Sequence, residues 1–266
     1  TLANGVKNFP NAPEQNISYV TALANQIAGT ELNPGQYDMD IYFNLNSSFY
    51  YGDGNPPFNQ IDFITLAMHE IGHGLGFYST AYVDANGLGS FGNIPSSAIS
   101  PISTSFPWPG QLNVPTIYDK HILLSSGNRL TDCAPANSAN LGDSIKTGPH
   151  YFSGSLFANA SNNNQSILLS GGDGSFYLGE SILHLDENFS NTIMSYYWGA
   201  GDTVRTPAPR ELGMLREIGW NLKLFSGLAD SSPADSRLSF YPNPVSSVLT
   251  VQTADISSLK LTDSSG

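Results

Sequence analysis

Apolar residues recur every three or four positions in three stretches of the chain, which is the spacing of one face of an α-helix. The first stretch, 13–28, begins at Pro13 and is followed by Gly29. The last, 209–220, begins at Pro209 and ends close to a glycine. Proline at the first helical position and glycine after the last one are typical helix boundaries. We therefore expect a helix in each of these two stretches.

The third stretch, residues 61–79, reads IDFITLAMHEIGHGLGFYS. Its spacing predicts an amphipathic helix whose core face carries Ile61, Ile64, Met68, Ile71 and Leu75. Each glycine in a helix costs about 1 kcal/mol relative to alanine. Because Gly72, Gly74 and Gly76 follow one another closely, we expect the helix to end within this run and the chain to turn at Gly76.

Alternation of apolar and polar residues replaces the helical spacing in residues 38–46, which predicts a half-buried strand just before the central helix. We expect it to be the edge strand of a mixed sheet packed on that helix. Residues 80–179 are rich in Gly, Pro, Ser and Asn, and their short apolar runs at 117–124 and 167–169 predict strands or short helices.

The C-terminal part of the chain changes in character twice. Residues 226–237 are small and polar, which is typical of a linker, and 238–266 alternate again like the strands of a β module. The pattern thus predicts an α+β domain in 1–225, a linker at 226–237, and the start of a small all-β domain in 238–266.

Composition narrows the classes of function. Ten Lys and Arg stand against 22 Asp and Glu, and the formal net charge is −12. Binding to the phosphates of nucleic acid needs clustered positive charge, so we expect no nucleic-acid partner. No apolar run approaches the roughly 20 residues that span a bilayer, and the chain opens without the basic start and apolar stretch of a signal peptide.

Cys133 is the one cysteine, so neither an intrachain disulfide nor a cysteine zinc cluster can form. A metal site must therefore use histidine and carboxylate side chains. The low charge and the many Asn, Ser, Gly and Tyr residues favour a secreted or surface-bound bacterial protein, which we expect to be a monomer.

The central helix carries His69, Glu70 and His73 in the order H-E-x-x-H. Positions i and i+4 lie one turn apart on one helix face, so both imidazoles can bind one metal ion, most simply Zn²⁺. Glu70 is the expected catalytic base, because its carboxylate can take a proton from a water at the metal.

A catalytic zinc usually takes three protein ligands. The remaining histidines, His121, His150 and His184, are candidates for the third, and a carboxylate from Glu180 or Glu187 is the alternative. Asp53 and Asp173 lie in glycine-rich turns that suggest structural Ca²⁺, but a calcium site needs several oxygens, so solvated turns are the simpler interpretation.

The stretch HEIGHGLGF resembles the zinc helix of metzincin metalloproteases, whose pattern H-E-x-x-H-x-x-G-x-x-H ends in a third histidine and precedes a Met-turn. This chain has Ser79 at that last position. Leishmanolysin-type proteases, which it resembles more closely, place a long insertion after Gly-Phe and take the third histidine from just before the Met-turn. That resemblance implies that His184 is the third ligand and that Met194 lies beneath the metal.

The same resemblance assigns expected roles to other residues. LGMLREIGW is similar to the closing helix of the group, and Asp186 or Glu187 would orient a ligating imidazole. Tyr196, two residues after Met194, resembles the tyrosine that astacin- and serralysin-like metzincins use as a switchable zinc ligand and oxyanion donor, which would make it catalytic. A pocket-lining aromatic is the alternative.

The C-terminal stretch FYPNPVSSVLTVQT resembles the start of a type IX secretion sorting domain, which implies the bacterial secretion machinery as a partner. Together the patterns predict a secreted zinc endopeptidase that hydrolyses protein or peptide substrates. Two alternatives stay open: a zinc aminopeptidase or other zinc hydrolase with a carboxylate third ligand, and a catalytically inactive metal-binding adhesion protein.

Overall fold

A computed structural model gives the structure of residues 2–44, 46–95, 113–156, 167–189, 191–222, 239–241, 248–253 and 256–262. The chain divides into two compact units, Thr1–Leu222 and Lys223–Gly266. The predicted linker, 226–237, lies outside the described residues. No helix in the described part of the chain is long and apolar enough to cross a membrane.

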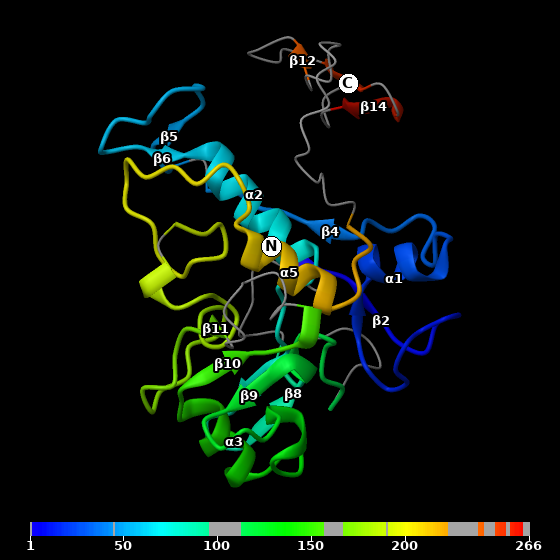
Figure 1. The fold of residues 1–266 in the computed structure, drawn as a ribbon, viewed down its shortest axis with the longest axis vertical. Coiled ribbons are helices and arrows are strands. Elements are labelled where there is room, and N and C mark those ends of the chain that lie inside the picture. The colour runs from blue at the N-terminus through cyan, green and yellow to red at the C-terminus, as the bar shows by residue number, and fades with distance from the viewer. Residues whose placement is uncertain are drawn as a thin grey trace. The chain divides into compact units, whose positions relative to one another are not determined.

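The larger unit combines helices with small sheets, so the predicted α+β class is confirmed (Figure 1). Its described helices are α1 (Thr21–Ala28), α2 (Phe63–Gly74), α3 (Ala139–Lys146) and α5 (Pro209–Glu217). The 3₁₀ turns in the described residues are η2 (Asp119–His121), η3 (Leu130–Asp132) and η4 (Glu187–Phe189).

The strands of this unit are short and mostly paired in twos. The antiparallel pairs are β1 (Leu2–Ala3) with β4 (Met39–Asp40), β2 (Gly5–Val6) with β3 (Tyr19–Val20), and β7 (Ala81–Val83) with β8 (Gly89–Phe91). The parallel pair is β5 (Phe49–Tyr50) with β6 (Ile61–Asp62). A three-stranded antiparallel sheet has the order β11 (Ile167–Leu168), β10 (His150–Phe152), β9 (Ile122–Leu124).

The smaller unit contains a three-stranded antiparallel sheet in the described residues. Its strands are β12 (Ser239–Tyr241), β13 (Val248–Thr253) and β14 (Ile256–Thr262), and β13 lies in the middle. The alternating pattern that predicted strands here is therefore confirmed at these positions.

Helix α2 begins at Asp62, whose carboxylate accepts a hydrogen bond of 3.0 Å from the backbone N–H of Thr65. It ends within the glycine run, as predicted, and Gly76 has a φ of +117°. A side chain at Gly76 would also collide with Ile218 just after α5. The turn after α2 thus requires glycine for both conformation and space.

The prediction of the buried face of α2 is only partly correct. Met68 and Leu75 are partly buried against the core, whereas Ile61, at the approach to the helix, and Ile71 are 38% and 41% exposed. The fully buried positions are Thr65, His69, Gly72, His73 and Gly74. The small glycines allow other segments to approach α2 closely on this face. The two histidines lie on the same face, so the helix buries its polar side.

Helix α1 is shorter than predicted, because it begins at Thr21 rather than near Pro13. Asn16 has a positive φ of 60°, and the backbone of Tyr19–Val20 pairs with β2 as strand β3. Tertiary pairing thus overrides the helical spacing of 13–20. The predicted end is confirmed, since Gly29 caps the helix with a left-handed φ of 69°.

The predicted strand at 38–46 is also mostly wrong. Only Met39–Asp40 form a strand, because their partner β1 is itself two residues long. Residues 41–44 carry no regular structure, and Leu45 lies outside the described residues. In 117–124 the strand is limited to β9, which follows η2. Helix α5 starts at Pro209 as predicted.

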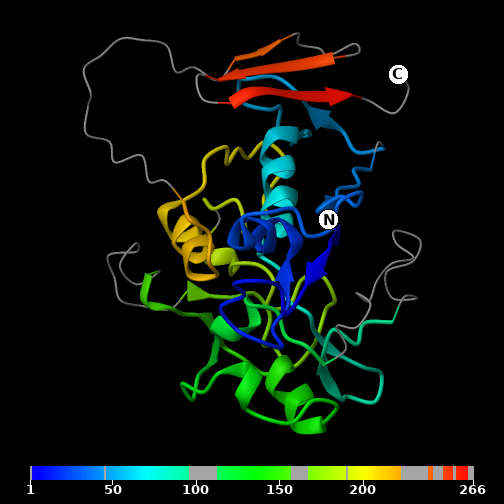
Figure 2. The ribbon, with the colours of Figure 1, turned by 90° about the vertical axis from the view of Figure 1, so that its right-hand side faces the viewer.

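Helices α1 and α5 flank the C-terminal end of α2 (Figure 2). The indole N–H of Trp220, which follows α5, donates to the carbonyl of Leu75 at 2.7 Å. A side chain at Gly219 would lie 3.5 Å from Ile27 of α1. These contacts fix the end of the helix that carries the histidines.

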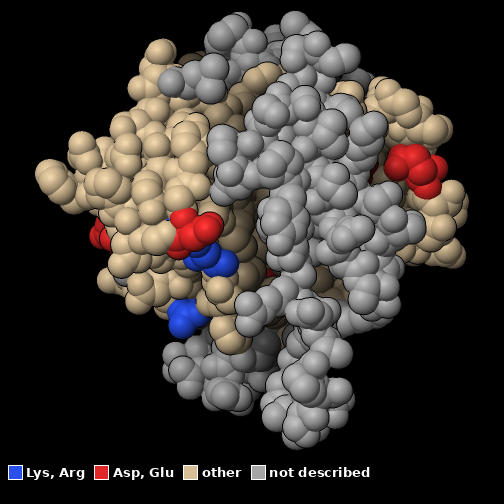
Figure 3. Space-filling model, turned by 90° about the horizontal axis from the view of Figure 1, so that it is seen from above, with Lys and Arg blue, Asp and Glu red and all other residues tan. Residues whose placement is uncertain are grey.

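Charged side chains are sparse on the described surface, as Figure 3 shows for one face. The Asp62–Arg205 pair reaches into the protein, because the Asp62 side chain is only 1% exposed. Arg205 Nε donates to Asp62 Oδ2 at 2.9 Å, and Arg205 Nη2 also donates to the carbonyl of Gly52 at 2.8 Å. Burial alone would raise the pKa of Asp62, but the hydrogen bonds from Arg205 and Thr65 outweigh it and lower the pKa. The pair ties the start of α2 to the segment before α5.

Candidate metal centre

Helix α2 holds His69 and His73 one turn apart on its buried face. Each side chain belongs to a residue only 6% exposed, and their Nε2 atoms lie 3.0 Å from each other. The helix spacing of i and i+4 brings the two rings together without help from the rest of the chain.

His184 joins them from the segment between β11 and α5, drawn in yellow beside α2 in Figure 1. Its Nε2 lies 3.2 Å from Nε2 of His69, although the two residues are 115 positions apart. Its backbone is held by a 2.9 Å hydrogen bond from Ser170 N–H to the His184 carbonyl. Ile182, two residues earlier, is fully buried with a φ of 70°, a strained conformation for a β-branched residue.

The other ring nitrogen of each histidine faces a backbone carbonyl. Nδ1 of His69 lies 2.8 Å from the Ile193 oxygen, Nδ1 of His73 lies 2.7 Å from the Phe77 oxygen, and Nδ1 of His184 lies 3.3 Å from the Glu180 oxygen. A carbonyl oxygen can only accept, so each Nδ1 carries the proton. Each neutral ring therefore presents an Nε2 lone pair to the common centre.

The protein environment keeps these imidazoles neutral. Burial lowers the pKa of all three, that of His73 far below its ordinary value and that of His184 to about 4. The proximity of the other histidines lowers the pKa of His73 and His184 further. Neutral imidazole is the form that binds a metal ion.

Three lone pairs at this separation repel one another unless a cation lies between them. A tetrahedral zinc site with bonds of about 2.0–2.1 Å separates its ligand nitrogens by roughly 3.3–3.4 Å, close to the 3.0 and 3.2 Å seen here. Within the described residues, these are the only three His, Cys, Asp or Glu side chains whose ligand atoms all lie within 4.8 Å of one another. The group could hold a metal ion.

Met194 packs against α2 at Gly72. It is 1% exposed, and a side chain at Gly72 would overlap its sulfur. Its backbone N–H donates to Glu211 Oε1 at 2.6 Å, and Glu211 Oε2 accepts from Ala208 N–H at 2.7 Å. Glu211 of α5 thereby fixes the turn whose Ile193 carbonyl orients His69.

The two residues predicted to be catalytic, Glu70 and Tyr196, lie near His69 and His184 respectively. Glu70 is half-buried and follows His69 directly on α2. The Tyr196 ring lies 6.0 Å from the His184 ring between centroids, and its hydroxyl donates to Glu180 Oε2 at 3.1 Å. That hydrogen bond is the main reason that the pKa of Tyr196 is raised, so its hydroxyl keeps its proton.

Trp198, which no sequence motif singles out, contacts His69. Its ring packs edge-on against the His69 ring at 4.6 Å, and its indole N–H donates to the Thr192 carbonyl at 3.2 Å. The available signal was its position four residues after Met194, within the same turn. Trp198 restricts the space beside His69.

The prediction that Asp186 or Glu187 orients a ligating imidazole is wrong, because backbone carbonyls occupy all three Nδ1 positions. Asp186 Oδ1 instead accepts from Asn188 N–H at 3.0 Å. The alternative third ligands Glu180 and Glu187 are not part of the group.

The two reserve histidines are used elsewhere. Nδ1 of His121 lies 3.1 Å from the Ser153 carbonyl, and Nε2 of His150 lies 2.8 Å from the Ser144 carbonyl. Asp53 and Asp173, considered for calcium, belong to no group of three close ligands in the described residues. Asp173 Oδ1 accepts from Ser175 N–H at 2.9 Å, which is an ordinary turn contact.

Ser79 occupies the position of the third histidine in the metzincin pattern. Its side chain makes a structural hydrogen bond instead of facing the histidine group. Its hydroxyl donates to Asp119 Oδ1 at 2.6 Å, and Asp119 Oδ2 accepts from Thr116 N–H at 2.8 Å. Asp119 is fully buried, which raises the pKa of its carboxyl. The contact anchors the chain as it leaves α2.

Comparison with known proteins adds one match. A family model described as SPBPB7E8-like matches residues 17–91, a segment that contains α1 and α2. The comparisons with curated proteins and with solved structures found no match.

Proposed function

We propose that the chain is a zinc-dependent endopeptidase. The observation that carries the proposal is the convergence of three buried, neutral Nε2 atoms next to Glu70 on the same helix. His69, His73 and His184 would hold the ion, and zinc bound there would supply a Lewis acid that polarises a peptide carbonyl and makes water more acidic. Three histidines without a cysteine suit Zn²⁺ among the common metals.

Glu70 is the proposed general base and acid. It takes a proton from the attacking water onto its carboxylate and later returns it to the nitrogen of the departing amine. The half-buried position of Glu70 beside His69 suits a group that must reach water and substrate in turn.

Tyr196 is the proposed oxyanion donor. Its protonated hydroxyl can hydrogen-bond to the negatively charged oxygen that forms at the scissile carbonyl. Reaching that oxygen would require Tyr196 to leave Glu180, its present acceptor. We expect Tyr196→Phe to lower turnover about 100-fold or more at unchanged zinc content. Undiminished turnover would leave Tyr196 as a pocket wall only.

The layout of the site supports a leishmanolysin-like metzincin. The third histidine follows a long intervening segment, Met194 packs under the metal-binding helix, and α5 closes the core behind it. For the smaller unit we propose a type IX sorting domain, and hence secretion to the medium or cell surface. The β12–β14 sheet is compatible with that proposal.

Cleavage of a denatured protein by wild type and Glu70→Gln tests the activity. Zinc content, measured by mass spectrometry, should be equal in both, whereas Glu70→Gln should cleave at least about 100-fold more slowly. Glu14→Gln, a change of the same kind at an exposed site outside the centre, is the matched control. Equal, slow cleavage by all three proteins would refute a peptidase and favour the metal-binding adhesion protein.

A further inference from the structure

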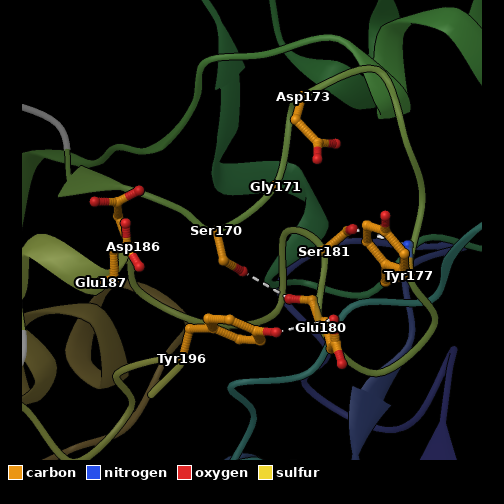
Figure 4. Close-up of a pocket in the computed structure, with 9 residues that line it drawn as sticks. All are labelled: Ser170, Gly171, Asp173, Tyr177, Glu180, Ser181, Asp186, Glu187 and Tyr196. Carbon is orange, nitrogen blue, oxygen red and sulfur yellow. Dashed lines mark hydrogen bonds between the residues drawn. The ribbon is translucent and has the colours of Figure 1, made fainter. Parts of the chain in front are cut away.

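A cavity of about 550 Å³ opens beside the metal centre, between the segment that follows β11 and the turn after Met194 (Figure 4). The volume is within the range of about 300–1,000 Å³ that ligand pockets have. Four carboxylates and two phenol rings dominate its lining: Asp173, Glu180, Asp186, Glu187, Tyr177 and Tyr196. None of the described residues that line it is Lys or Arg.

The cavity shares its wall with the metal centre. The Glu180 carbonyl accepts from Nδ1 of His184, while the Glu180 carboxylate accepts from the Tyr196 hydroxyl. Glu180 and Tyr196 both line the cavity. The Tyr196 ring, which lines the cavity, lies 6.0 Å from the His184 ring between centroids, a span that a long side chain next to a scissile bond at the histidines can cover.

The carboxylates surround the cavity rather than converge. Asp173 lies at one end, Asp186 and Glu187 at another, and Glu180 faces the Tyr196 hydroxyl (Figure 4). They form no group of three ligand atoms within 4.8 Å, so they do not make the compact oxygen cage of a calcium site. Negative charge that is spread around a wide cavity favours an organic cation larger than a metal ion.

The aromatic residues point to the same class of ligand. Phenol rings such as those of Tyr177 and Tyr196, which are 52% and 44% exposed, provide surfaces for the apolar stem of a long basic side chain. Their ring faces also attract ammonium and guanidinium groups. Carboxylates and aromatic rings together therefore select for positive charge at the end of an apolar stem.

We propose that this cavity binds the side chain of a lysine or arginine next to the scissile bond, and that Glu180 determines the preference. The assignment rests on the proposed endopeptidase function. Glu180 is singled out because its carboxylate lines the cavity and accepts from Tyr196, whose ring lies 6.0 Å from that of His184.

A peptide library tests the preference. Peptides cut from a proteome after Glu residues keep Lys and Arg inside, and mass spectrometry identifies the bonds that the zinc-loaded wild type cleaves. We expect Lys and Arg to be enriched up to about fivefold at one position beside the cleaved bond, the largest ratio that one solvent-accessible ion pair supplies. Acetylating the library should abolish the enrichment of lysine and leave that of arginine.

Two variants separate the cavity from general electrostatics. Glu180→Gln keeps an acceptor for Tyr196 and should reduce the enrichment to below about twofold. Glu14→Gln removes the same charge outside the cavity lining and should retain it. Equal enrichment in wild type and Glu180→Gln, or no enrichment in wild type, would overturn the assignment.

A binding measurement distinguishes this inference from the proposed function. Zinc-loaded Glu70→Gln is titrated with fluorescent peptides that differ only by arginine or citrulline at one position, followed by anisotropy. Tighter binding of the arginine peptide, lost on adding Glu180→Gln, supports the cavity even if wild type cleaves nothing. If wild type cleaves peptides but neither assay shows a preference for Lys or Arg, the cavity assignment is overturned and the endopeptidase function stands. If there is neither cleavage nor preference, both proposals are overturned.

Discussion

The sulfur of Met194 lies so close to Gly72 that an added Cβ would approach it to less than 3.0 Å, which real Cβ atoms essentially never do. Gly72 is buried on α2, one position before His73. Met194 follows Ile193, whose carbonyl faces Nδ1 of His69. The absence of a side chain at Gly72 thus gives room to the turn that orients one histidine of the group.

We predict that Gly72→Ala destabilises the protein by about 1–2 kcal/mol. Helix propensity alone predicts the opposite, a gain of up to about 1 kcal/mol. The displaced Met194 also moves the neighbouring Ile193 carbonyl, so zinc affinity should fall. Urea denaturation and a competitive zinc titration measure the two effects.

The double variant Gly72→Ala/Met194→Ala is the control for this contact. Removing the sulfur removes the collision, so the two changes should be non-additive, the hallmark of residues in contact. A Gly72→Ala protein at least as stable as wild type, with unchanged zinc affinity, would contradict the packing argument.

His184→Ala should lower zinc affinity by more than about 100-fold, because removal of a partner that merely orients a ligand already costs 10- to 100-fold. Competition with a chromogenic chelator measures the affinity. His121→Ala is the matched control, since His121 lies outside the histidine group and faces the Ser153 carbonyl. If His184→Ala bound zinc as tightly as wild type, the third ligand would have to be another residue.

The metal-free protein should lose stability as the pH falls from about 6.5 towards 4. Burial lowers the pKa of His69, His73 and His184 in the folded protein, and that of His184 to about 4, whereas the unfolded chain titrates at the ordinary value of 6.5. In that window the unfolded state binds more protons, so stability rises with pH and is lost on acidification.

Thermal unfolding in the presence of a chelator measures this dependence. His184→Ala should show a shallower slope across the same window, because one titrating group with a lowered pKa is gone. Identical slopes for the two proteins would indicate that the histidines do not share the buried, neutral state inferred for them.

Arg205→Gln should destabilise the protein by about 2 kcal/mol, between the values for exposed and for buried ion pairs, because it leaves the buried Asp62 carboxylate without its cation. The lowered pKa of Asp62 means that the pair stabilises the fold above pH 3.8 and that this contribution is lost as the pH falls below that value. Denaturation at pH 7 and at pH 3 measures both effects.

Lys146→Gln is the control for Arg205, since it breaks the surface pair of Lys146 with Asp143, whose side chain is 70% exposed. We expect that change to alter stability by less than about 0.5 kcal/mol. Equal effects of the two substitutions would show that the Asp62–Arg205 pair contributes no more than a surface contact.

Helix boundaries could be predicted from the sequence wherever they depend on residues close together in the chain. The end of α2 in its glycine run, the cap at Gly29 and the start of α5 at Pro209 follow from backbone preferences of single residues. The predictions that failed involve partners from elsewhere: Tyr19–Val20 pair with β2, and the partner of Met39–Asp40 is only two residues long.

Two nitrogens of the histidine group follow from the sequence, because the i and i+4 spacing of His69 and His73 is a property of one helix. The third nitrogen depends on the tertiary structure. The fold brings His184 from 115 positions away, assigns the Nδ1 protons through the carbonyls of Phe77, Glu180 and Ile193, and excludes Glu180 and Glu187 from the group. Distances between residues far apart in the chain depend on how its segments pack, and no local pattern encodes them.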